Sequence, residues 1–209
     1  MIFISSNKYK MNQTSSKKGI FLALVLLLII IGAIVYRINH KFVPSQTING
    51  EYIDDYKNLS INLPTGWKES NKIVGASSTE VWFEDSKAGD ENKAGASILI
   101  RRFDRGNNMT DLINKIGGNN FIDLIVLDLT SGIDNYKIVS TSTEQINGRN
   151  FRVTKGTYEG TSSKRSVTQY LYITLRDEAY YLIGADIYTD LLPKYEKVIL
   201  DSIKTIKFN

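Results

Sequence analysis

The stretch SVTQYLYITLRDEAYYLIGADI, residues 166–187, decides the fold of this chain. In its first half Val167, Gln169, Leu171, Ile173 and Leu175 fall on one parity, and Tyr170 and Tyr172 fall on the other. Such alternation is typical of a β-strand, because successive side chains point to opposite faces of a sheet. The charged run 176–178 predicts a turn, and residues 179–187 predict the returning strand. The stretch therefore predicts an antiparallel hairpin.

Further strands are predicted on both sides of this hairpin. They cover residues 56–64, 81–83, 96–103 and 136–145, and a return strand that carries Phe151 and Val153. Asn147-Gly148 lies between the last two and is a strong signal for a two-residue turn, because both positions accept a positive φ. The chain therefore reads as a succession of hairpins rather than as alternating strands and helices.

Three segments show helical spacing. The first begins near Asp111, and the second, residues 119–129, is rich enough in apolar residues to predict a well-buried helix, with a strand as the alternative. The last begins at Pro193, which suits a first helical turn. Its predicted buried stripe consists of Tyr195, Val198, Ile199, Ser202, Ile203 and Ile206.

The two ends of this region resemble the PsbP-like family, named for an extrinsic subunit of photosystem II. The N-terminal element is Tyr56 followed by Ile61-Asn-Leu63-Pro64-Thr-Gly66-Trp67, a strand that closes on a Pro-x-Gly-Trp turn. The C-terminal element is the hairpin with Tyr170, Tyr172, Tyr180 and Tyr181, followed by a helix that ends in Asp201-Ser202-Ile203-Lys204. The likeness covers about residues 50–208.

The resemblance implies an α+β fold, an antiparallel sheet with helices on both faces in an α/β/α sandwich. The family includes photosystem subunits, a regulator of a small GTPase and many exported prokaryotic proteins. It has no shared catalytic set, so no catalytic, cofactor-binding or metal-binding residue is carried over to this chain. Histidines that serve as candidate metal ligands in some members have no counterpart, since residues 50–209 contain no His.

The apolar run GIFLALVLLLIIIGAIVY, residues 19–36, precedes this domain. Eighteen helical residues span roughly 27 Å, close to the hydrocarbon thickness of a bilayer. We expect an uncleaved signal-anchor, with a cleaved signal peptide as the alternative, because the run is long and no A-x-A site follows it. Residues 1–18 then form a tail, which starts at Met1 or Met11, and residues 37–49 form a linker.

Charge predicts the orientation of this anchor. Four Lys and no acidic residue precede residue 19, whereas Arg37 and Lys41 follow the run, so we expect the N-terminus inside and residues 50–209 outside the cytoplasmic membrane. Six of the 26 Lys and Arg precede Phe42, whereas all 22 Asp and Glu follow it. The domain is thus slightly acidic, which argues against nucleic-acid binding.

Composition excludes several chemistries. The chain has no Cys, and its one histidine, His40, lies just past the apolar run. Cys-based nucleophiles, Ser-His-Asp triads and Cys/His zinc sites are therefore excluded. The remaining candidates for acid–base or metal chemistry are Asp186 with Asp190, near a strand end, and the carboxylates of the loop from Glu84 to Glu91. The spacing of the loop carboxylates does not match an EF-hand loop. We interpret these carboxylates as solvated loop residues, and Asp186 and Asp190 as residues of the turn and of the start of the final helix.

Two further patterns concern surfaces. The basic clusters Arg101-Arg102-x-x-Arg105 and Lys164-Arg165 are expected at solvated rims, because neighbours on a strand point to opposite faces. The twelve tyrosines are expected to pack in the sheet, with an amphipathic contact surface as the alternative.

These observations favour a non-enzymatic, membrane-anchored binding module of the prokaryotic cell envelope. Its partner would be a protein or an envelope component, bound through sheet, loop or tyrosine surfaces, without a cofactor. The alternatives are a carboxylate- and metal-dependent enzyme, and a carrier with a small-ligand pocket between sheet and helix.

Overall fold

The structure is a computed structural model that describes residues 46–209, except 56, 76–77, 86–94, 105–106, 162 and 177–178. The predicted tail, the apolar run 19–36, His40 and most of the Glu84–Glu91 loop lie outside the described residues. Within the described part, no helix is both long and apolar enough to cross a bilayer.

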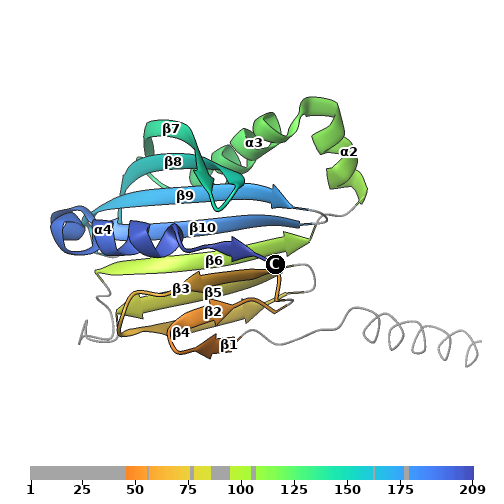
Figure 1. The fold of residues 1–209 in the computed structure, drawn as a ribbon. Coiled ribbons are helices and arrows are strands. Elements are labelled where there is room, and N and C mark those ends of the chain that lie inside the picture. Colours follow the sequence, from red (N-terminus) through yellow and green to blue (C-terminus); the bar gives the residue numbers. More distant parts are fainter. Residues whose placement is uncertain are drawn as a thin grey trace, which may run out of the picture. The chain divides into compact units, whose positions relative to one another are not determined.

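The described residues form eleven strands, three α-helices and one 3₁₀ turn (Figure 1). The strands are β1 (Gln46–Ile48), β2 (Glu51–Ile53), β3 (Leu59–Asn62), β4 (Trp67–Val74), β5 (Ser78–Asp85), β6 (Ala96–Asp104), β7 (Lys137–Ile146), β8 (Arg149–Glu159), β9 (Ser166–Arg176), β10 (Ala179–Tyr188) and β11 (Lys207–Phe208). The helices are α2 (Asn107–Ile116), α3 (Gly118–Ser131) and α4 (Leu192–Ile203), and the 3₁₀ turn η1 is Thr189–Leu191.

The predicted hairpin of residues 166–187 is confirmed as β9 and β10. It lies inside a seven-stranded, fully antiparallel sheet with the order β4-β5-β6-β10-β9-β8-β7. Ile173 lies opposite Leu182, and Tyr172 lies opposite Ile183. Both parities of this hairpin are buried, because each face of the sheet is covered by other elements.

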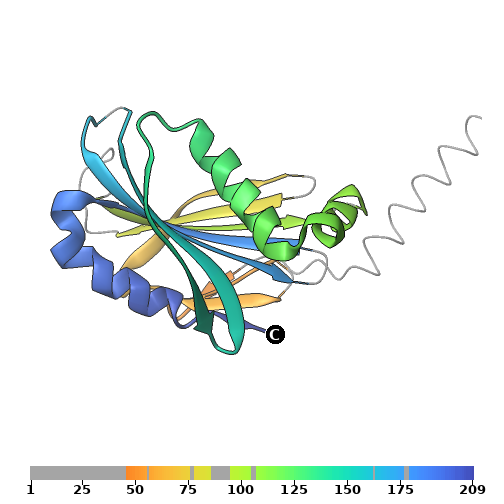
Figure 2. The same cartoon turned by 90° about the horizontal axis from the view of Figure 1, so that it is seen from above.

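Two apolar clusters occupy opposite faces of this sheet. On one face α4 and a small sheet, with the order β1-β2-β3-β11, cover Tyr170, Tyr172, Tyr181 and Ile183. On the other face α3 covers Leu171, Ile173 and Leu182 through Ile122 and Val126. Figure 2 shows α3 and α4 on opposite sides of the strands. The domain is thus an α+β fold with helices on both faces of an antiparallel sheet.

Helix α4 follows the prediction except at one position. Pro193 lies in its first turn, and Tyr195, Ile199, Ser202 and Ile203 are buried. Val198 is 45% exposed, so the prediction that it lies in the middle of the buried stripe is wrong. At about 100° per residue, position 198 falls at the margin of the stripe, about 85° from its centre.

The N-terminal part of the domain contains strands that the sequence did not indicate. The Pro64-x-Gly66-Trp67 turn is present, with Gly66 at φ 85°, but β4 then begins at Trp67 and forms an edge of the large sheet. The first strand β1 takes residues 46–48 from the range 37–49 that was assigned to a linker. Strands of two to four residues carry too few positions to show alternation.

The segment 119–129 is confirmed as helical, but its predicted burial is wrong in part. Helix α3 buries Phe121, Ile122, Val126 and Thr130, and it exposes Leu124 and Leu127. Some of the many apolar side chains of residues 119–129 are therefore exposed to solvent. The Asn147-Gly148 turn is confirmed, with φ values of 47° and 80°.

Candidate functional site

The two carboxylates predicted near the end of β10 have separate partners. Asp190 lies in η1 and is exposed, and Arg165 donates bonds of 2.7 and 2.6 Å to its two oxygens. The same guanidinium lies 3.8 Å from the centre of the Tyr188 ring. Arg165 also lowers the pKa of Asp190, chiefly through these hydrogen bonds. The structure thus assigns Asp190 to a surface ion pair.

Asp186 belongs instead to a polar cluster on the α3 face of the sheet. Its Oδ1 accepts a hydrogen bond of 2.8 Å from Nε2 of Gln169, its neighbour across β9. The hydroxyl of Tyr158, on β8, also bonds to this carboxylate. Burial raises the pKa of Asp186, and the two hydrogen bonds lower it by less. A carboxylate with a raised pKa and neighbouring hydroxyls is the arrangement that acid–base sites use.

Tyrosine rings form the wall of this Asp186 cluster. Tyr136 and Tyr158 are stacked, with ring centres 6.1 Å apart and planes at 22°. Tyr136 crosses the backbone of Gly156 so closely that a Cβ there would lie 2.2 Å from its hydroxyl oxygen. Burial, followed by the charge of Asp186, raises the pKa of Tyr136 to about 12. Gly156 therefore lets an aromatic ring lie over the sheet beside a carboxylate.

Two polar atoms near Asp186 lack a hydrogen-bond partner among the described residues. They are the hydroxyl of Tyr136 and Oε1 of Gln169, and both are buried. A buried polar atom without a partner costs free energy, so such atoms are unusual in native proteins. The Asp186 cluster can therefore offer both a donor and an acceptor to one further polar group.

A second polar network lies between the two sheets, and no sequence pattern predicts it. Asp54 accepts hydrogen bonds from the backbone N–H groups of Asn58 (2.6 Å) and Leu59 (2.9 Å), and burial raises its pKa. Asp55, 1% exposed, binds Lys72 Nζ and Thr79 Oγ1 at 2.9 Å each.

This Asp54–Asp55 network encloses little space. The adjoining cavity of about 10 Å³ is also lined by Arg102 and Tyr181, and it suits one water-sized molecule. The sequence signal for this network is the pair Asp54-Asp55 before β3, which is a common turn pattern. Its geometry indicates a structural role in joining β3 to β4 and β5.

The remaining predicted polar candidates do not assemble into a site. Of the Glu84–Glu91 loop, Asp85 is described at the end of β5, where it accepts a hydrogen bond of 3.0 Å from Tyr195. Arg101 pairs with Glu80, and Arg102 with Asp104, so both arginines are held in ion pairs rather than at a free rim. Across the described ranges, no group of three or more His, Asp or Glu residues could hold a metal ion.

The tyrosines pack within the domain. Six of them are buried, and three more are partly buried: Tyr52, Tyr170, Tyr172, Tyr180, Tyr181 and Tyr195, then Tyr136, Tyr158 and Tyr188. The interpretation as sheet packing is confirmed for the six buried tyrosines, and the alternative of a tyrosine contact surface is wrong for those six. The exposed large apolar residues of the described part are all aliphatic.

The outer face of α3 carries two of these aliphatic residues. Leu124 is 51% and Leu127 62% exposed, three residues apart and thus on neighbouring turns of one side. Asp123 and Asp128 flank them, and Arg152 binds Asp123 at 2.9 Å. We call Leu124 and Leu127 the α3 ridge. The sequence signal was the apolar excess of residues 119–129, which was interpreted as burial.

An open pocket of about 410 Å³ lies where α3 begins, beside the turn between β7 and β8. It is lined by Gly118, Asn119, Ile122, Gly148, Arg149, Asn150, Thr174 and Leu175. Arg149 provides its only full charge, and this side chain also donates a hydrogen bond of 3.1 Å to the carbonyl of Leu175. The volume lies within the range of small-ligand sites.

Comparison with known proteins shows likeness in structure alone. No protein-family model matches the chain, and no curated protein sequence matches it. Cyanobacterial PsbP (CyanoP) from Synechocystis sp. PCC 6803 is similar in structure, with a TM-score of 0.50 at 14% identity, over 76% of this chain and 91% of that one.

Two further solved structures are similar over most of their length. The Ran-binding protein Mog1p of Saccharomyces cerevisiae has a TM-score of 0.51 at 11% identity, covering 78% of this chain and 96% of its own. LpqN of Mycobacterium tuberculosis, described as involved in cell envelope biogenesis, has a TM-score of 0.50 at 13% identity, covering 72% and 83%. The described domain therefore has the α+β fold of PsbP-like proteins.

Proposed function

We propose that this chain is a non-catalytic binding module, anchored in the cytoplasmic membrane by residues 19–36, with its PsbP-like domain outside. The domain binds a protein of the cell envelope through the α3 ridge. The single observation that carries this proposal is the exposure of Leu124 and Leu127 on the outside of a helix whose inner side is packed on the sheet.

The energetics of the α3 ridge support a docking role. Single exposed leucines are common on protein surfaces, but two on one side of one helix form a continuous apolar strip. Fully burying a leucine side chain is worth about 1.5–3 kcal/mol, and a little over half of each side chain is exposed, so a partner that covers both gains about 2–3 kcal/mol in total. Asp128 carries no ion pair within the described residues and lies beside the strip. The fitting partner thus presents an apolar surface next to a Lys or Arg.

The fold likeness and the polar contacts also support a binding role. Two proteins of similar fold are described by a partner or a process, Ran binding for one and cell envelope biogenesis for the other. In this chain Asp190, Asp54 and Asp55 each have hydrogen-bond partners inside the domain. Their contacts are of the kind that stabilise a scaffold.

A site-specific crosslinking experiment tests the α3 ridge. A photo-reactive amino acid at Leu127 of the full chain, expressed in its native membrane, is expected to give a discrete adduct with one envelope protein. The same photo-reactive amino acid at position 197 of α4 is the control, because the Lys197 side chain is 87% exposed. It should give no such adduct. Adding Leu124→Asp should remove the Leu127 adduct, because the new charge would have to be desolvated at the interface.

Two outcomes of this crosslinking would contradict the proposal. Equal adducts at Leu127 and Lys197 would indicate random collision. An adduct that survives Leu124→Asp would show that the α3 ridge does not bind the crosslinked protein.

The topology is tested separately by proteolysis. Protease added to intact cells without their outer envelope is expected to digest residues 50–209, because the N-terminal lysines resist translocation. The membrane should retain a fragment of roughly 4–5 kDa that contains the 18-residue apolar run. Full protection of the domain would reverse the orientation, and a soluble domain starting near Ile34 would show a cleaved signal peptide.

A small-ligand carrier is the second candidate function, and the pocket of about 410 Å³ favours it. The carrier hypothesis predicts a ligand pocket between sheet and helix, and this pocket lies between α3 and the large sheet. Asn150 would bind a polar end of the ligand, and Ile122 and Leu175 would contact its apolar part. This pocket adjoins the first turn of α3, whereas the α3 ridge lies further along the helix. Variants in the pocket and variants at the ridge would therefore separate ligand binding from partner binding.

A further inference from the structure

The two edges of the large sheet differ in how they are protected. Edge strand β4 contains Lys68, Glu69 and Lys72 and an irregularity between Glu69 and Asn71. Charges and bulges are the usual devices that prevent an edge from pairing with another chain. Edge strand β7 also has one irregularity, between Ile138 and Ser140, but its six residues from Ile138 to Thr143 (IVSTST) carry no charge, Pro or Gly.

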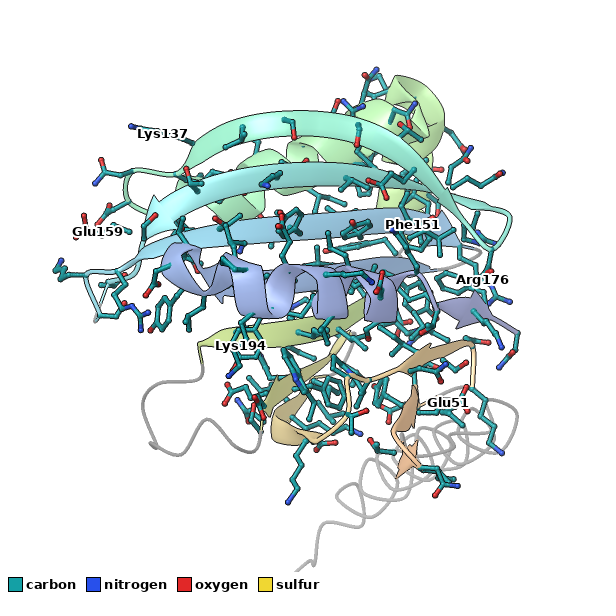
Figure 3. All side chains as sticks on the ribbon, turned by 60° about the vertical axis from the view of Figure 1, so that its left-hand side comes forward. Glu51, Lys137, Phe151, Glu159, Arg176 and Lys194 are labelled. Atoms are coloured by element: carbon teal, nitrogen blue, oxygen red, sulfur yellow. The ribbon has the colours of Figure 1, made fainter. Side chains whose placement is uncertain are left out.

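The outer side of β7 is open to solvent. Residues 137–143 are all exposed, with Ile138 at 57% and Val139 at 59%. Figure 3 shows Lys137 at one end of this outermost strand. An edge strand of ten residues offers a row of unpaired backbone groups, which is the template for adding a strand from another chain.

The only two charges of β7 lie near its ends, and the bulge places them on the same face. Lys137 pairs with Thr157 and Glu144 with Phe151, two β8 residues of the same parity. The register shift between Ile138 and Ser140 leaves Val139 as an extra residue. Without this extra residue, the seven-residue spacing of Lys137 and Glu144 would direct them to opposite faces.

This arrangement is self-complementary under a two-fold axis. We propose that two copies of this chain associate by antiparallel pairing of their β7 strands, with Thr141 opposite Thr141 of the second copy. Ser140 then lies opposite Ser142, and beyond the extra residue Val139, Lys137 lies opposite Glu144 of the other copy. Each interface therefore contains two Lys–Glu pairs, and the two seven-stranded sheets become continuous.

The physical terms favour this occupant of the edge. Directly opposed residues of an antiparallel pair interact, and opposite charges there stabilise whereas like charges destabilise. In the described part of the structure, neither Lys137 nor Glu144 forms an ion pair within the domain, so both are available. A two-fold interface uses one surface twice, which matches a strand with one positive and one negative end.

A single cysteine tests the pairing in the full chain, which has no Cys of its own. Opposed Cα atoms in an antiparallel pair lie about 4.5–5.5 Å apart, within disulfide range. Thr141→Cys is therefore expected to give a disulfide-linked dimer under mild oxidation in the native membrane. Ile73→Cys, 54% exposed on the opposite edge β4, is the control and should remain mainly monomeric.

Charge reversal then tests the register. In the Thr141→Cys background, Lys137→Glu or Glu144→Lys alone should reduce the dimer yield about tenfold, because each change turns two attractions into two repulsions. The two reversals together should restore the yield. Co-expression of the two single reversals should give a mixed dimer. A variant that merely misfolds would not be rescued in this way.

Three results would overturn the proposal. Equal crosslinking at Thr141→Cys and Ile73→Cys would indicate collision without pairing. A dimer yield that is indifferent to both charge reversals would exclude this register. An adduct of Thr141→Cys with a different protein, in place of a second copy, would assign the β7 edge to another partner.

Discussion

Replacing Ile199 by Asp is expected to unfold the described domain at room temperature. Ile199 is fully buried in the middle of α4, where the helix packs against β10 and β3. The substitution removes a side chain from the core and leaves a carboxylate with no partner there. The two losses together amount to several kcal/mol, comparable with the total stability of about 5–15 kcal/mol for a domain.

The neighbouring position supplies a matched control. Val198→Asp introduces the same carboxylate one residue away, at a side chain that is 45% exposed. We expect its free energy of unfolding to stay within about 0.5–1 kcal/mol of wild type. Urea unfolding followed by circular dichroism measures both variants. Similar destabilisation at the two positions would show that α4 is rotated from its described orientation.

The contrast between these two residues shows how far periodicity predicts this fold. Pro193 and the spacing of Tyr195 and Ile199 predict the helix and its buried side, because both depend on local geometry alone. Whether Val198, at the margin of the buried stripe, is covered depends on which elements the helix packs against. That contact involves β3, about 140 residues earlier in the chain, so no local pattern contains it.

The strands divide in the same way. The hairpins β7–β8 and β9–β10 were predictable, since their alternation and the Asn147-Gly148 turn are local signals. The small sheet was not, because β11 pairs with β3 through Lys207 and Ser60 across most of the chain. Strand β4 was missed because its side chains are mostly polar and exposed.

The candidate sites were less predictable than the fold. The sequence placed Asp186 and Asp190 four residues apart, but side-chain partners decide their roles, and those partners come from other strands and loops. The α3 ridge is visible in the sequence as an apolar excess, but its exposure depends on which side of α3 packs on the sheet, and that side is the one with Ile122 and Val126. In the sequence, the buried Asp54–Asp55 network shows only as a pair of residues typical of a turn.

The charged form of Asp186 destabilises the folded domain. Ala185 and Ile187, its neighbours along β10, point to the opposite face of the sheet, and on its own face the carboxylate lies beside Gln169 and Tyr158. Burial raises its pKa above the ordinary value of 3.8, so the folded state binds this proton more tightly than the unfolded state does. Each unit of such a shift is worth about 1.4 kcal/mol between the two protonation states.

The sign of the pH dependence follows from this raised pKa. Below the unfolded pKa the group is protonated in both states, and its contribution to stability is fully present. As the pH rises through the folded pKa, that contribution is lost, because the folded state must then hold a charge in a poorly solvated site. Asp54 has the same sign, so only a comparison between a variant and wild type isolates Asp186.

Asp186→Asn is therefore expected to be more stable than wild type at pH 7, by about 1.4 kcal/mol for each unit of raised pKa. The amide keeps an oxygen for Gln169 Nε2, and its N–H can donate to the Tyr158 hydroxyl, so no partner is left without a bond. Urea unfolding of both proteins between about pH 3 and 8 should show the difference shrinking towards the acid end. Gln169→Glu, which places a second carboxyl beside Asp186, should instead be less stable than wild type at pH 7. If wild type proved more stable than Asp186→Asn at pH 7, with the gap widening as the pH rises, the carboxylate would be stabilised by its donors and the cluster would not favour a protonated acid.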